Sequence, residues 1–152
     1  MKKIILMLFS ILSISAFAQK RETVQIMNEY KIALCKATMV KLVNDAKPYY
    51  KKGQTKEEFC KLAGNNYSEL EPSYQKLADE IFVNLTANNP NELIYNNSDS
   101  KALLTIISGK RDGGSPKGKS LKGFWEKVGK TLERIGETIN YLVCVWTEGK
   151  GC

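Results

Sequence analysis

The clearest pattern in the chain is a run of apolar residues near the C-terminus, spaced alternately four and three positions apart. The eight residues are Leu121, Trp125, Val128, Leu132, Ile135, Ile139, Leu142 and Trp146. Lysine, arginine and glutamate side chains fall on the opposite side of the same helical wheel. We call the apolar set the seam. It predicts a long amphipathic helix over residues 120–147 that buries one face.

The seam permits three interpretations. In the first, the helix folds back and completes a bundle, and Gly129 and Gly136 beside the seam allow close packing. In the second, it docks on a protein partner or a second copy, because tryptophans often anchor interfaces. In the third, it lies in an anionic membrane surface. Residues 119–146 hold five basic and three acidic side chains, and this mixed charge favours packing against protein.

A second helix is predicted over residues 22–46, and it is apolar on two sides. One face holds Val24, Ile32, Cys35, Met39, Leu42, Val43 and Ala46, and the other holds Ile26, Met27, Tyr30, Ala33, Leu34 and Ala37. A helix that is apolar on two sides is typical of the centre of a bundle. Pro48 ends the helix, because the residue before a proline avoids helical geometry.

Two further helices have clear start signals. Thr55 and Glu58 form a capping box, which opens a short helix that stops at Gly64. Pro72 suits the first turn of a helix that continues to Leu85.

The remaining segments complete the predicted organisation. Residues 88–97 are rich in asparagine and predict a surface loop, and Ser98 or Asp99 caps another helix that ends at Gly109. The predicted divisions are a signal peptide at 1–18, a helical body at 19–109, a flexible basic linker at 110–119, a C-terminal helix at 120–147 and a tail at 148–152. We therefore predict an all-α fold, a small disulfide-stabilised bundle of about five helices.

The N-terminus has the pattern of a secretion signal. Lys2 and Lys3 precede an almost continuous apolar run at residues 4–17, and Ala16-Phe17-Ala18 fits a cleavage site before Gln19. We expect a secreted or periplasmic protein. Removal of residues 1–18 from the 152 leaves 134, which suits one domain.

The formal net charge of +7 is spread along the chain rather than gathered on one segment. A dedicated nucleic-acid binder usually concentrates its basic residues on one face, so we expect no nucleic-acid partner. An anionic membrane surface is a weaker candidate than a protein partner or self-association.

The four cysteines predict two disulfides, because an exported chain with an even cysteine count favours them. We expect the local pairs Cys35–Cys60 and Cys144–Cys152; an intermolecular or free Cys152 is the alternative. The chain has no histidine and no Cys-x-x-Cys pair. No metal site and no cofactor are therefore expected.

The sequence also limits the chemistry available. Without histidine there is no Ser-His or Cys-His nucleophile. Carboxylate pairs such as Glu57 with Glu58 could support a small hydrolase, but neighbouring helical residues diverge and suit caps and surface charges better. We expect a non-catalytic protein that binds a protein or surface partner. The alternatives are a membrane-active, antimicrobial or toxin-like factor carried by the C-terminal helix, and a carboxylate-dependent hydrolase.

Overall fold

The computed structural model describes residues 2–87, 101–109 and 121–147, and these ranges contain helices and connecting turns but no strand. The elements are α1 (Lys2–Ala46), the short 3-10 helix η1 (Lys47–Tyr49), α2 (Lys56–Leu62), the 3-10 helix η2 (Tyr67–Glu69), α3 (Pro72–Thr86), α5 (Lys101–Gly109) and α6 (Gly123–Trp146). The prediction of an all-α helical bundle is confirmed.

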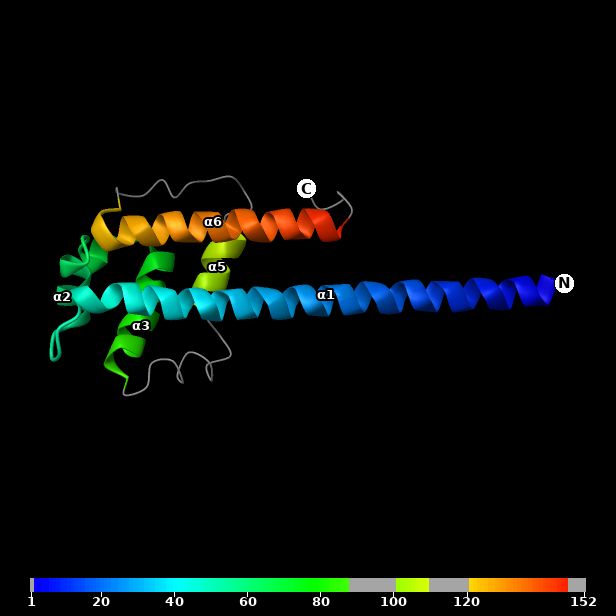
Figure 1. Ribbon diagram of the computed structural model, residues 1–152, viewed down its shortest axis with the longest axis horizontal. Helices are drawn as coiled ribbons and strands as arrows, with labels where there is room; N and C mark the ends of the chain where they lie inside the picture. Colours follow the sequence, from blue (N-terminus) through cyan, green and yellow to red (C-terminus); the bar gives the residue numbers. More distant parts are fainter. Residues whose placement is uncertain (1, 88–100, 110–120, 148–152) are drawn as a thin grey trace.

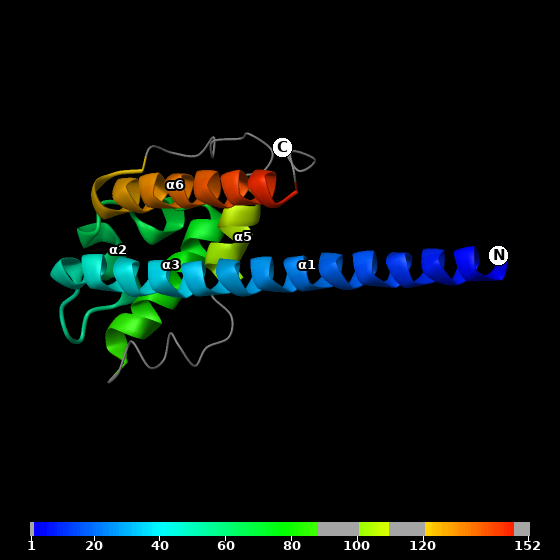
Figure 2. The same ribbon diagram turned by 45° about the vertical axis from the view of Figure 1, so that its right-hand side comes forward.

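The long helices α1 and α6 lie side by side and run in opposite directions (Figure 1). The shorter helices α3 and α5 pack across this pair, and α2 lies at the end where α1 finishes and α6 begins (Figure 2). The N-terminal part of α1 extends well beyond the end of α6. The bundle therefore has one end closed by α2 and a second end where, of the helices that the structure describes, only α1 and α6 remain.

Aromatic rings gather in the core at the end closed by α2, where several of them meet edge to face. Phe59 of α2 lies 6.3 Å from Trp125 and 6.5 Å from Phe124, between ring centroids. Such pairs add to the stabilisation that burial provides. α1 contributes its first predicted apolar face from Cys35 onward: Cys35, Met39, Leu42, Val43 and Ala46 are buried. The sequence pattern thus identified the core side of α1 correctly from Cys35 onward, whereas Val24 and Ile32 of the same predicted face are exposed.

Local signals set the helix boundaries as expected. α1 ends at Ala46, two residues before Pro48. Thr55 Oγ1 accepts a hydrogen bond from the Glu58 amide (3.3 Å), and a Glu58 carboxylate oxygen accepts one from the Thr55 amide (2.8 Å). This capping box satisfies two amides that the first turn of α2 would otherwise leave unpaired.

A close backbone contact joins the end of α2 to the start of α6. The Phe124 amide donates to the Ala63 carbonyl (2.9 Å), and the Lys122 amide donates to Asn65 Oδ1 (2.8 Å). Gly64 lies at the crossing, with φ of +120°, and a Cβ there would collide with the Lys122 carbonyl. We call this contact the α2–α6 clamp; it requires glycine because both the backbone conformation and the space exclude a side chain.

Helix α5 is held by its apolar face and by one carboxylate. Ala102, Leu103, Ile106 and Ile107 are buried, and Glu80 of α3 accepts a hydrogen bond from the Ala102 amide (3.2 Å). The caps expected at Ser98 or Asp99, the loop at 88–97, the linker at 110–119 and the tail at 148–152 lie outside the described residues.

The predicted Cys35–Cys60 disulfide is wrong, because both cysteines are buried free thiols. Cys35 lies eleven residues before the end of α1, a rise of about 16 Å. α2 packs beside that end (Figure 1), whereas a disulfide needs Cα atoms within about 7 Å. Short separation along the chain therefore did not mean proximity in space. Cys144 is disulfide-bonded; Cys152 lies outside the described residues, so its pairing with Cys144 stays a prediction.

Candidate binding surface

The seam of α6 is buried along most of its length and becomes exposed at its last turn. Trp125, Val128, Leu132 and Ile139 are buried; Leu121, Ile135 and Leu142 are half-buried; Trp146 is 42% exposed. The change follows from the lengths of the helices, because α6 continues past the short helices that cover it (Figure 2). Among the described helices, the last part of the seam has only α1 beside it.

A small pocket lies between the two helices at this end. Met27 and Tyr30 of α1 and Leu142 and Trp146 of α6 line a cavity of about 90 Å³. Its walls are apolar apart from the tyrosine hydroxyl and the indole nitrogen. It is therefore a place where an apolar group could leave water.

Exposed apolar side chains also lie near the ends of the two helices that form the pocket. Val24 lies upstream on α1, and Tyr141, which is 69% exposed, and Val145 lie on α6. We call the combined surface the open end; it consists of Val24, Met27, Tyr30, Tyr141, Leu142, Val145 and Trp146. Exposed apolar side chains gathered at one end of a protein, beside an apolar pocket, are typical of an interaction site.

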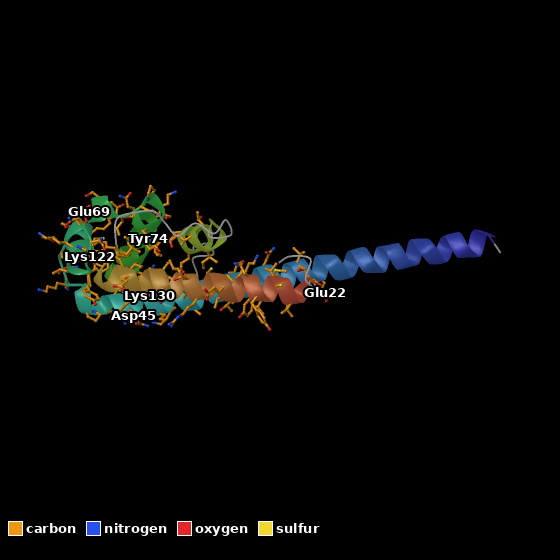
Figure 3. The ribbon with its side chains drawn as sticks, turned by 90° about the horizontal axis from the view of Figure 1, so that it is seen from above. Glu22, Asp45, Glu69, Tyr74, Lys122 and Lys130 are labelled. Atoms are coloured by element: carbon orange, nitrogen blue, oxygen red, sulfur yellow. The ribbon has the colours of Figure 1, made fainter. Side chains whose placement is uncertain are left out.

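Exposed acidic side chains lie beside the open end. Glu22 and Glu29 are exposed on α1, and Figure 3 shows Glu22 near the end of α6. Glu137 is exposed on α6, whose last turn carries no basic residue. Among the described side chains, this surface shows no concentration of positive charge of the kind that attracts anionic lipid or nucleic acid.

The second predicted apolar face of α1 differs from the first in its burial. Ile26 and Tyr30 are each 46% exposed, and Ala33 and Ala37 are also exposed. Within one chain, the prediction that α1 is central and covered on both sides is therefore wrong. Most of its second face lies opposite the core and faces solvent, while Met27 and Leu34 at its edge are half-buried.

Three acidic residues of α2 and α3 have structural contacts. Glu58 caps α2, and Glu80 caps α5. Asp79 pairs with Lys56 (2.7 Å) and accepts a hydrogen bond from the Tyr67 hydroxyl (3.1 Å). The Lys56–Asp79 bond raises the pKa of Lys56 to about 12, which keeps this amine protonated. The arrangement ties η2 to α2 and α3.

The described residues can also be compared with the requirements of a metal site and of a membrane span. In residues 2–87, 101–109 and 121–147, no group of three or more Cys, Asp or Glu residues is placed to hold a metal ion. None of the helices described is long and apolar enough to cross a membrane.

The pocket residues on α1 were not singled out by the sequence pattern as a site. Met27 and Tyr30 were assigned to an apolar face, and Leu142 and Trp146 to the seam. Only the packing shows that the two sets meet where the bundle narrows. No family model matches the chain, and no curated protein or solved structure shows detectable similarity to it.

Proposed function

We propose that this chain is an exported, non-catalytic protein that binds a protein partner through the open end. The observation that carries the proposal is the last turn of the seam, where Trp146 remains 42% exposed beside an apolar pocket. A bundle that had only to fold could end α6 before this turn. Tryptophan and tyrosine are the residues that most often dominate binding energy at protein interfaces.

The size of the pocket favours a protein over a small molecule as the ligand. Pockets for drug-sized ligands usually measure about 300–1,000 Å³, whereas this one measures about 90 Å³. It suits one apolar side chain of a partner. The exposed Tyr141 and Val145 would then contact the partner around that side chain.

The leader and the tail support export as part of the same proposal. Cleavage before Gln19 would leave a new N-terminus close to Val24, at the open end. A Cys144–Cys152 disulfide would clamp the C-terminal end of α6, where a loop of this size contributes about 2–3 kcal/mol. Intact mass of the secreted product reports both changes; a product that retains residues 1–18 would contradict the export proposal.

Site-specific crosslinking tests the binding surface. A photo-reactive amino acid at Tyr141 should give a discrete protein adduct in cultures of the producing cell. The matched control places it at Glu133, which is exposed on the same helix but lies away from the open end. Trp146→Ala should remove the Tyr141 adduct without changing the far-UV circular dichroism. An equal adduct from Glu133, or no protein adduct from Tyr141, would overturn the proposal.

A membrane-active role is the alternative that the seam suggests. Dye release from anionic phosphatidylglycerol vesicles, measured with the whole protein, distinguishes the two roles. We expect no release, because Glu22, Glu29 and Glu137 lie beside the exposed apolar residues and repel anionic lipid. Release that Trp146→Ala abolishes would favour the membrane role instead.

A further inference from the structure

The solvent-facing side of α1 carries a regular apolar stripe, most of which is exposed in the part of the chain that the structure describes. Its residues follow three-four spacing along the helix: Thr23, Ile26, Tyr30, Ala33, Ala37 and Val40. Ile26, Tyr30, Ala33 and Ala37 are exposed, and Thr23 and Val40 are half-buried. We call this set the α1 stripe. Its spacing is that of a helix packed against a second, nearly parallel or antiparallel helix.

We propose that a second copy of this chain covers the α1 stripe, with the two α1 helices antiparallel. The inference goes beyond the proposed function, because the stripe lies opposite the core of α1 and does not include α6. Only Tyr30 belongs to both surfaces. Three complementarities between the residues of the stripe and its flanks support this occupant and this direction.

The first complementarity is in size. In an antiparallel pair of helices, one register sets Tyr30 of each copy opposite Ala33 of the other. The same register sets Ile26 opposite Ala37, and Thr23 opposite Val40. Tyr30 and Ile26 then each face an alanine, and the Thr23–Val40 pair is of medium size, so the helices can approach closely without leaving voids.

The second complementarity is in charge. Glu29 and Lys36 lie on the same flank of the stripe, seven residues apart. The antiparallel register that pairs Tyr30 with Ala33 also brings Glu29 of each copy beside Lys36 of the other. Two-fold symmetry forms this pair twice. In a parallel pair, Lys36 would instead approach Lys41 of the other copy, and like charges would repel.

The third complementarity concerns the other flank, which is apolar. Met27 and Leu34 are half-buried there and pack partly against the core. In the antiparallel register, Met27 of one copy approaches Leu34 of the other. The flank nearer the core therefore excludes water while the charged flank sets the register. The same patch serves both copies, so the assembly closes as a dimer.

Sedimentation equilibrium of the whole protein over a range of concentrations tests the proposal. We expect a reversible dimer. Ala37→Glu should weaken it at least about tenfold, because a carboxylate would face Ile26. Asn140→Glu, an equally exposed substitution on α6, is the matched control and should leave the dimer unchanged. A protein that stays monomeric up to about 1 mM, or a dimer insensitive to Ala37→Glu, would overturn the proposal.

A charge exchange tests the antiparallel register itself. Glu29→Lys and Lys36→Glu should each weaken the dimer about tenfold, because each places like charges together. The double variant restores opposite charges in this register and should recover most of the affinity. Failure of the double variant to recover would refute the register. Trp146→Ala should not affect dimerisation, so this proposal and the proposed function can fail separately.

Discussion

Replacing Gly64 with alanine should destabilise the protein far more than an ordinary glycine substitution. Gly64 has φ of +120°, which L residues rarely adopt, and this strain costs about 1–3 kcal/mol. The new Cβ would also lie 2.8 Å from the carbonyl carbon of Lys122, where only backbone movement can make room.

That movement acts on the α2–α6 clamp. The Phe124–Ala63 and Lys122–Asn65 hydrogen bonds both span the crossing, and each contributes about 1 kcal/mol. Together with the strain, Gly64→Ala should lower the free energy of unfolding by about 3–5 kcal/mol. Gly53→Ala is the matched control, since Gly53 also has positive φ (+88°) but nothing within 4 Å of its Cβ. It should cost about 1–2 kcal/mol.

Urea unfolding followed by tryptophan fluorescence measures the difference, because Trp125 is fully buried beside the clamp. If Gly64→Ala leaves too little folded protein, Asn65→Ala removes one clamp bond alone and should cost about 1–2 kcal/mol. Equal effects of Gly64→Ala and Gly53→Ala would refute the reasoning that the clamp carries stability.

Three other consequences can be measured directly. Thr55→Ala removes the capping box and should lower the free energy of unfolding by about 1 kcal/mol in urea titrations, whereas an unchanged midpoint would contradict its role. Burial raises the pKa of Glu80 above its ordinary value, so folding takes up a proton between the two pKa values and stability falls as pH rises above about 4.5. Glu80→Gln should lessen that fall between pH 4 and 7, and an identical pH dependence would contradict the assignment. Burial also raises the pKa of Cys35 to about 11 and of Cys60 to about 12, so neither thiol should react with Ellman's reagent in the native protein. Urea without reductant should expose two reactive thiols if Cys144 is bridged to Cys152, and four would contradict that pairing.

Short-range chemistry made part of this fold predictable. Thr55 and Glu58 satisfy each other's amides within one turn. Pro48 and Pro72 restrict the backbone conformation at their own and the preceding positions. These effects depend on a few consecutive residues, so the sequence displays them. The buried face of α1 from Cys35 onward was predictable for a similar reason, because helical periodicity is a property of one segment.

The features that the sequence could not supply depend on distant partners. The α2–α6 clamp joins Asn65 to Lys122, and no local pattern identifies such a pair. Cys35 and Cys60 are close along the chain but separated by the rise of α1. The seam is regular through Trp146, yet only the length of neighbouring helices determines that its last turn is uncovered. The seam pattern therefore predicted burial for residues that form part of the open end.

The aromatic cluster at the closed end has a consequence for the timing of folding. Phe124 and Trp125 of α6 pack against Phe59 of α2. This aromatic part of the core therefore needs residues from α6. A chain still being synthesised cannot complete this core until nearly all of it has emerged, and contacts between such distant residues form slowly. In the export that we propose, that delay would keep the chain in the unfolded state that passage across a membrane through a narrow channel requires.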